Sequence, residues 1–190
     1  YELDNELPNQ PMVFLKPSSS IIFDGDCIQL PSQSNDVHHE VEMVVAIGKA
    51  GKQIPKDQAL DHIAGYGVGI DVTARDIQQQ AKNDAHPWTV AKGFDTFAPI
   101  SKFVTWHRIQ DPQDVSLKIT VNGITRQSDN TKLMIFSIPE LISHLSAIFT
   151  LQPGDLIFTG TPKGVSPIKS GDQIEATMNN GLASLAVSVQ

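Results

Sequence analysis

Two glutamates one residue apart, Glu40 and Glu42, are the residues of this chain whose spacing most suggests chemistry. In a β-strand, side chains alternate between the two faces, so residues at positions i and i+2 point the same way. Two carboxylates on one face repel each other unless water solvates them or they share a cation. Because the apolar run Met43–Val45 follows them, a divalent metal ion would relieve this repulsion. The alternative is an edge strand whose charged residues face water.

A third carboxylate, Asp71, follows the glycine-rich segment 65–70, which is typical of a strand whose backbone approaches another part of the chain closely. The sequence Thr73–Asp76 has the form of a capping box, so a helix is expected to begin there. Three carboxylates would suit a hard ion such as Mg²⁺ or Mn²⁺ and would leave positions open for water and substrate. Zinc fits less well, because the chain has no CxxC or HExxH motif.

Two further segments carry groups that could bind an anion. Lys92 lies between small and aromatic residues, where a partly desolvated lysine could hold an anionic substrate or stabilise an oxyanion. The alternative is a surface lysine whose stem lies along apolar neighbours. In Gly160–Gly164, backbone N–H groups and the Thr161 hydroxyl could reach an anionic group. The alternative for that segment is a tight turn.

Composition limits the classes of partner. The 190 residues carry a net charge of −7 and 18% charged residues. No cluster of Lys and Arg is longer than two, which argues against nucleic acid or an anionic membrane as the main partner. No apolar run approaches the ~18 residues of a membrane span. We therefore expect a cytoplasmic protein, although the first residue is Tyr1 and a natural start with a targeting segment could lie upstream.

Many short strands and only two or three helices predict an α+β fold dominated by sheet, in a single domain covering residues 1–190. The Asn-Gly pairs at 122–123 and 180–181 predict two hairpins. The sequence Ser137–Glu140 predicts the start of a helix. A second, shorter helix is expected over 57–64, with Leu60 and Ile63 facing inward.

Taken together, several segments resemble the fumarylacetoacetate hydrolase family in order and spacing. The similarity runs from Glu2 almost to the C-terminus and is strongest to the short, single-domain acylpyruvate hydrolase and oxaloacetate decarboxylase-like members. It implies a β-rich roll of mixed sheets with a few peripheral helices, assembled as a homodimer. The segments that carry it are Pro11–Pro17, His38–Glu42, Gly69–Asp76, Trp88 with Lys92–Asp95, and Gly160–Gly164.

The resemblance also implies roles for individual residues. Glu40, Glu42 and Asp71 would hold Mg²⁺ or Mn²⁺. The residues expected to contact the carboxylate and keto oxygens of the substrate are Arg75, Gln78, Lys92 and Thr161, with Lys16 near the pocket and Thr96 close to the metal region.

A water-activating pair, His-x-x-Glu, lies on a short lid helix in relatives. Glu2 matches its glutamate and is expected, with Lys92, to be catalytic. The matching histidine would precede Tyr1, so the lid segment is expected to be incomplete in this sequence.

The resemblance and the local chemistry together predict a metal-dependent hydrolase that cleaves the C–C bond of small 3-acylpyruvates. The metal would stabilise the enolate formed as the bond breaks, and the same stabilisation would support decarboxylation of oxaloacetate. One alternative is an isomerase or tautomerase of 2-hydroxy-dienoates in aromatic catabolism, which moves a proton without splitting carbon from carbon. Another is a non-catalytic module that binds a 2-oxo acid or a metal.

Overall fold

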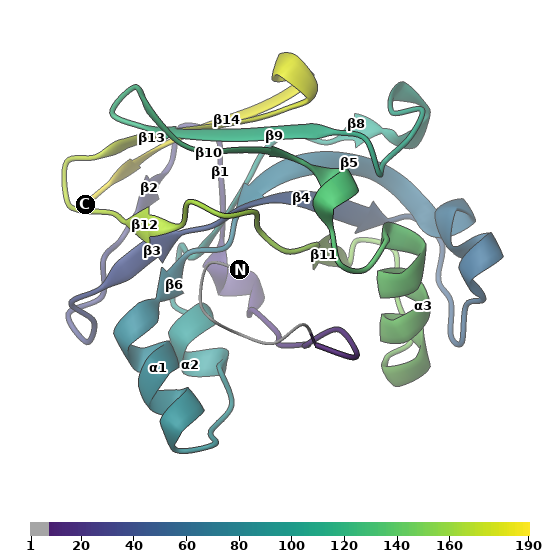
Figure 1. The fold of residues 1–190 in the computed structure, drawn as a ribbon, viewed down its shortest axis with the longest axis horizontal. Coiled ribbons are helices and arrows are strands. Elements are labelled where there is room, and N and C mark those ends of the chain that lie inside the picture. Colours follow the sequence, from purple (N-terminus) through teal and green to yellow (C-terminus); the bar gives the residue numbers. More distant parts are fainter. Residues whose placement is uncertain (1–7) are drawn as a thin grey trace.

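The computed structural model describes residues 8–190 (Figure 1). Its helices are α1 (Arg75–Asn83), α2 (Thr89–Lys92) and α3 (Ile138–Ile148), with short 3₁₀ helices at Ser18–Ser20, Lys56–His62, Trp106–Arg108, Thr131–Leu133 and Asn179–Gly181. Its strands are β1 (Ile21–Phe23), β2 (Cys27–Ile28), β3 (Val37–His39), β4 (Val41–Ile47), β5 (Ile63–Ile70), β6 (Thr73–Ala74), β7 (Ala98–Ile100), β8 (Val104–Thr105), β9 (Ser116–Val121), β10 (Ile124–Asn130), β11 (Leu156–Phe158), β12 (Ser166–Pro167), β13 (Gln173–Met178) and β14 (Ala183–Val189).

These strands form three sheets, of which the two larger are mixed and the smallest is antiparallel. The six-stranded sheet has the order β1-β7-β5-β4-β11, with β8 also paired to β5, and the five-stranded sheet has the order β10-β9-β13-β14-β2. A small third sheet has the order β12-β3-β6. Apolar side chains of the two larger sheets share one buried cluster, which includes Val45 and Val68 from one sheet and Ile119 and Ile174 from the other. Figure 1 shows the few helices at the periphery, so the predicted α+β class is confirmed.

Local turn and cap signals predicted the corresponding elements correctly. β9 and β10 pair antiparallel around Asn122 and Gly123, and β13 pairs with β14 around the second Asn-Gly pair. Helix α3 begins with a complete capping box, in which the Ser137 hydroxyl accepts from the Glu140 N–H and the Glu140 carboxylate accepts from the Ser137 N–H. These signals depend on neighbours in the sequence, so they do not require tertiary information.

Two local predictions are wrong in part. The segment Lys56–His62 is a 3₁₀ helix in which Ala59 and His62 are buried, whereas Leu60 is 44% exposed. Ile63 is buried as predicted, but as the first residue of β5. Thr73 does not cap α1, because it lies in β6 and its hydroxyl donates to Asp71 O at 3.1 Å. Helix α1 begins at Arg75, within the predicted segment, and the Arg75 backbone N–H donates to Asp36 O.

The glycine-rich strand β5 is closely approached by its neighbours, as predicted. A Cβ at Gly65 would lie 2.3 Å from the backbone oxygen of Val104, and one at Gly69 would lie 2.7 Å from the Phe158 ring. Such contacts leave no room for a larger residue, so glycine permits the tight packing. Within residues 8–190, no helix has both the length and the hydrophobicity needed to cross a membrane.

Candidate metal centre

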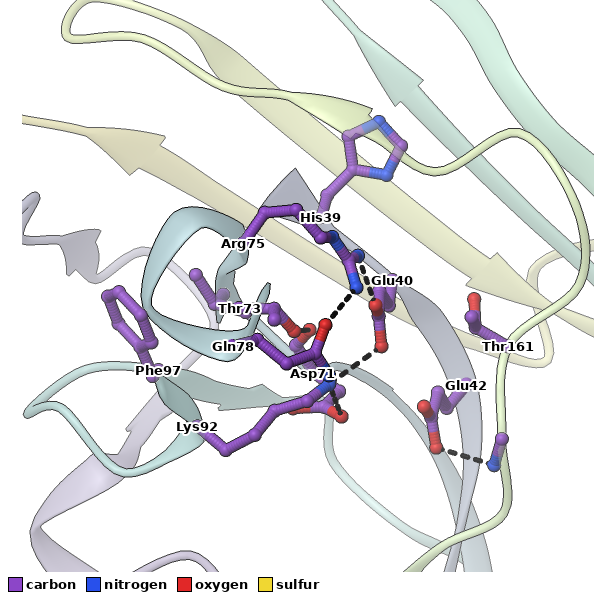
Figure 2. Close-up of polar contacts among 12 residues, drawn as sticks. His39, Glu40, Glu42, Asp71, Thr73, Arg75, Gln78, Lys92, Phe97 and Thr161 are labelled. Atoms are coloured by element: carbon purple, nitrogen blue, oxygen red, sulfur yellow. Dashed lines mark hydrogen bonds and ion pairs between the residues drawn. The ribbon is translucent and has the colours of Figure 1, made fainter. Parts of the chain in front are cut away.

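Three buried carboxylates converge where the six-stranded and the three-stranded sheets meet. Each of Glu40, Glu42 and Asp71 offers an oxygen atom within 4.8 Å of those of the other two. The three residues are only 7%, 4% and 1% exposed. Figure 2 shows them facing one another from the β3–β4 segment and from the end of β5. The arrangement is therefore not an exposed edge strand, and the alternation argument for Glu40 and Glu42 holds.

Backbone pairing explains how the three residues meet. Glu40 lies between β3 and β4, where the chain leaves the three-stranded sheet and enters the six-stranded one. The antiparallel register pairs Glu42 with Gly69, and Val41 with Ile70. One residue further on, the Asp71 N–H donates to Glu40 O at 2.8 Å. Asp71 is thus fixed opposite the two glutamates by main-chain hydrogen bonds.

Basic side chains from α1 and α2 pair with two of the carboxylates. Lys92, at the end of α2, is 2% exposed, and its Nζ lies 2.8 Å from Glu40 Oε2 and 2.5 Å from Asp71 Oδ2. Arg75 donates to Glu40 Oε1 and, at 2.7 Å, to Gln78 Oε1. Lys92 is accordingly not a surface lysine, and the predicted substrate contacts Arg75, Gln78 and Lys92 lie together beside the acidic cluster.

Lys16 lies against the same cluster but has a different set of partners. Its Nζ is within hydrogen-bond distance of the backbone oxygens of Val72, Lys92 and Phe97, and it is 2.8 Å from Asp71 Oδ1. An ammonium group has three N–H donors. Because three carbonyls accept them, the contacts of Lys16 are those of a cation that fixes Asp71 and the backbone around it; its contact with substrate stays a prediction.

The segment 160–162, called here the 160–162 loop, forms another side of the cluster. The Gly160 N–H donates to Glu42 Oε2 at 2.6 Å, and the Thr161 hydroxyl donates to Val41 O at 2.8 Å. Thr161 is therefore held next to Glu42 (Figure 2). Gln127 also contacts this loop, and the sequence reasoning missed it because β10 reads as a polar, exposed strand.

Two other predicted residues are not part of this geometry. Thr96 accepts a hydrogen bond from Gln29 N–H at 2.9 Å, and none of its described contacts reaches the three carboxylates. Glu2 lies outside the described residues, so its catalytic role stays a prediction. His38 and His39 are not part of the carboxylate cluster within residues 8–190, which agrees with the expectation of an all-oxygen site.

The electrostatics of the cluster favour a bound dication. Burial raises the pKa of Glu42 well above its usual range, and the negative charges of Asp71 and Glu40 raise it further. Among the described residues, no basic side chain forms an ion pair with Glu42, whereas Glu40 and Asp71 each have two. A hard dication held by the three carboxylates would offset this repulsion. The residues present therefore fit Mg²⁺ or Mn²⁺.

Lys92 and Lys16 respond differently to this environment. Burial alone would lower the pKa of Lys92, but the charges of Asp71 and Glu40 and their hydrogen bonds outweigh burial and raise it. For Lys16, burial dominates and lowers the pKa, although Asp71 opposes the shift. The site thus holds Lys92 as a firmly charged ammonium between two carboxylates.

The comparisons with known proteins agree with this geometry. The family model described as fumarylacetoacetate (FAA) hydrolase C-terminal matches residues 2–190. The chain therefore belongs to the fumarylacetoacetate hydrolase family, as the sequence motifs indicated.

Individual relatives match over most of their length. The mitochondrial oxaloacetate tautomerase of Arabidopsis thaliana is 46% identical over 189 residues, covering 100% of this chain and 84% of that protein. The mitochondrial oxaloacetate decarboxylase of Dictyostelium discoideum is 48% identical over 175 residues, covering 92% and 80%. The solved structure of fumarylpyruvate hydrolase from Pseudomonas aeruginosa in complex with Mn²⁺ and pyruvate has a TM-score of 0.88 and 37% identity, covering 93% and 77%.

Glu42→Gln is expected to stabilise the metal-free protein near neutral pH while weakening Mn²⁺ binding by at least about 100-fold. Because the pKa of Glu42 is raised, the folded protein binds this proton more tightly than the unfolded chain. The free energy of unfolding of the wild type should therefore decrease as pH rises from about 4.3, the ordinary glutamate value, through the raised pKa. Because glutamine does not ionise, Glu42→Gln should lack this decrease in unfolding free energy.

Urea unfolding of chelator-treated protein over a pH series, together with Mn²⁺ titration calorimetry, measures both effects. Glu175→Gln is the matched control, because Glu175 is exposed on β13. If the unfolding free energy changes equally with pH in the wild type and in Glu42→Gln, the raised pKa of Glu42 is contradicted.

Proposed function

We propose that the protein is a metal-dependent enzyme that stabilises the enolate of a small 2-oxo acid, and that it interconverts the keto and enol forms of oxaloacetate. The observation that carries this proposal is the buried Glu40, Glu42 and Asp71 cluster with Lys92 held between two of its members. The near full-length similarity to an oxaloacetate tautomerase and an oxaloacetate decarboxylase supports oxaloacetate as the substrate.

In this proposal the acidic residues bind the metal, and the basic and amide side chains contact the substrate. Glu40, Glu42 and Asp71 would hold Mg²⁺ or Mn²⁺, and the chemistry that such an ion supplies is Lewis-acid polarisation of the keto oxygen. Lys92 places its ammonium where it can donate a hydrogen bond to an oxygen on which negative charge develops. Arg75 and Gln78 would bind a substrate carboxylate, a task for which the planar guanidinium of arginine is suited.

Hydrolysis of 3-acylpyruvates, the reaction first expected from the sequence, is the second candidate. It is favoured by the similarity to a fumarylpyruvate hydrolase solved with Mn²⁺ and pyruvate. Hydrolysis needs an activated water in addition to enolate stabilisation. Glu2 is the residue proposed to activate this water, with the lid histidine that the family resemblance implies as its partner.

The test is a substrate comparison with full-length protein. With Mn²⁺, the ultraviolet band of the oxaloacetate enol should disappear at least about 100-fold faster than with Mn²⁺ alone, the size of effect expected from a preorganised electrostatic site. Pyruvate is measured in the same samples, and an acylpyruvate is tested in parallel.

Each outcome separates the candidates. Enol decay without pyruvate supports tautomerisation, pyruvate from oxaloacetate supports decarboxylation, and pyruvate only from the acylpyruvate supports hydrolysis. Rates equal to Mn²⁺ alone for every acid would contradict an enzyme and favour a binding module. A homodimer and a cytoplasmic location are also proposed, and sedimentation and cell fractionation test them.

A further inference from the structure

Gln127 is a buried polar residue on a strand whose surroundings are exposed. It is 1% exposed, whereas its neighbours Arg126 and Ser128 are exposed on β10. The β9–β10 register shifts between Thr125 and Gln127, so Arg126 is an extra residue in the ladder. Such bulges turn the following side chain toward the other face. The shift pairs Gln127 with buried Ile119 and directs it inward.

The hydrogen bonds of Gln127 are complete, and their direction is fixed by main-chain partners. Its Oε1 accepts from Val41 N–H at 3.0 Å, and its Nε2 donates to Pro162 O at 2.7 Å. Since a backbone N–H only donates and a carbonyl only accepts, these two contacts fix the orientation of the amide. Nε2 then donates its second hydrogen to Thr161 Oγ1 at 2.8 Å.

His39 and Ser166 support the amide from the side of its oxygen atom. His39 is fully buried, and its Nδ1 lies 3.0 Å from Gln127 Oε1. Because that oxygen only accepts, Nδ1 carries a hydrogen, and in the neutral imidazole Nε2 then accepts from the Ser166 hydroxyl at 2.7 Å. The chain of contacts therefore runs in one direction, from Ser166 through His39 and Gln127 to Thr161.

This chain ends on the 160–162 loop, which borders the metal centre. The loop donates the Gly160 N–H to Glu42 and presents Thr161 beside it. The following glycine also fits tightly, since a Cβ at Gly164 would lie 2.2 Å from Arg126 O, and its φ is +100°. The bulge on β10 is therefore packed at backbone distance against the segment that directly follows the loop.

We propose that Gln127 is a positioning residue that holds the 160–162 loop against the metal centre, with His39 and Ser166 fixing its orientation. Through the loop, Gln127 sets the position of the Gly160 N–H on Glu42 and of the Thr161 hydroxyl. Its effect on catalysis rests on the proposed function and on the substrate contact expected of Thr161 from the family resemblance. Its effect on the position of the loop is independent of both.

The test replaces Gln127 by methionine, which has a similar size and none of the four hydrogen bonds. The matched control is Gln113→Met, because Gln113 also donates and accepts through its amide but bonds Ile138 N and Thr131 O instead of the loop. Hydrogen–deuterium exchange of the peptide covering 159–165 should become at least about 10-fold faster in Gln127→Met only.

Kinetics give the second measurement. At saturating Mn²⁺, Gln127→Met should raise the KM for oxaloacetate about 10-fold and change kcat less than about threefold, because Lys92 is untouched. Thr161→Val should raise the KM by a similar factor. The double variant should raise it little further, because both changes remove the hydrogen bond between Gln127 Nε2 and Thr161 Oγ1. If Gln127→Met acted through a general loss of packing, it would lower kcat as well, and its effect on KM would add to that of Thr161→Val.

The outcomes separate this proposal from the proposed function. Exchange at 159–165 that equals the wild type, or a KM that is unchanged while the wild type is active, overturns the role of Gln127. If the wild type acts on none of the acids, the proposed function fails, and the exchange measurement still decides whether Gln127 holds the loop. If Gln127→Met does not fold, Ser166→Ala should give a twofold to threefold increase in exchange at 159–165, about what loss of one hydrogen bond produces.

Discussion

Asp71→Asn is expected to reduce Mn²⁺-dependent turnover to below about 1% of the wild type. The change removes one of three carboxylates from a cluster in which each is buried. It also places an amide between Lys16 and Lys92, which lie 2.8 Å and 2.5 Å from the two Asp71 oxygens. Mn²⁺ affinity should fall by at least about 100-fold, more than for changes outside the ligand shell.

Asparagine is chosen because it keeps the shape of the side chain. The two buried lysines lose a shared anion, so a decrease in unfolding free energy of about 3 kcal/mol is also expected. Calorimetric titration with Mn²⁺, a kinetic assay and urea unfolding measure the three quantities, with exposed Glu175→Gln as control. If Asp71→Asn keeps wild-type activity at moderate Mn²⁺, Asp71 is not required to bind the metal.

Lys92→Met is expected to give the second large effect, and its effect on stability should depend on metal. In metal-free protein, Glu40 and Asp71 each lose a buried cation 2.8 Å or less away, which should cost about 3–5 kcal/mol. Added Mn²⁺ supplies positive charge to the same carboxylates, so it should recover much of this loss. Turnover should stay about 10²–10³-fold lower, because no ammonium remains to stabilise developing negative charge.

Thermal unfolding with chelator and with saturating Mn²⁺ gives the two stabilities, and a kinetic assay gives the turnover. Lys118→Met is the control, because Lys118 is exposed on β9. A stability loss in Lys92→Met that Mn²⁺ does not reduce would mean that Lys92 and the metal do not share ligands.

Sequence periodicity could predict that Glu40 and Glu42 lie together because their spacing is local, whereas Asp71 joins them through pairing of β4 with β5. The spacing of Glu40 and Glu42 places them on one face of any strand, and the glycine run before Asp71 marks a closely packed strand. Turn and cap residues at Asn122–Gly123 and Ser137–Glu140 act over a few positions, so the corresponding elements were correct. The capping box expected at Thr73 failed because backbone pairing in β6 took precedence.

Gln127 and Lys16 could not be assigned contacts in this way. The partners of the Gln127 side chain lie between 34 and 88 positions away in the sequence, and its burial depends on a bulge created by pairing with β9. Lys16 reaches backbone oxygens 56 to 81 positions away. No local pattern around either residue carries this information.

By itself, the sequence determined the class of fold and the shared face of Glu40 and Glu42, since alternation, turns and caps act between neighbours. The family resemblance added Asp71 as the third carboxylate of the same cluster. Only the tertiary structure decided which cation faces which carboxylate, and how the 160–162 loop is held. Those contacts join residues from different sheets and helices, and hydrogen-bond geometry requires positions that only the packed chain defines.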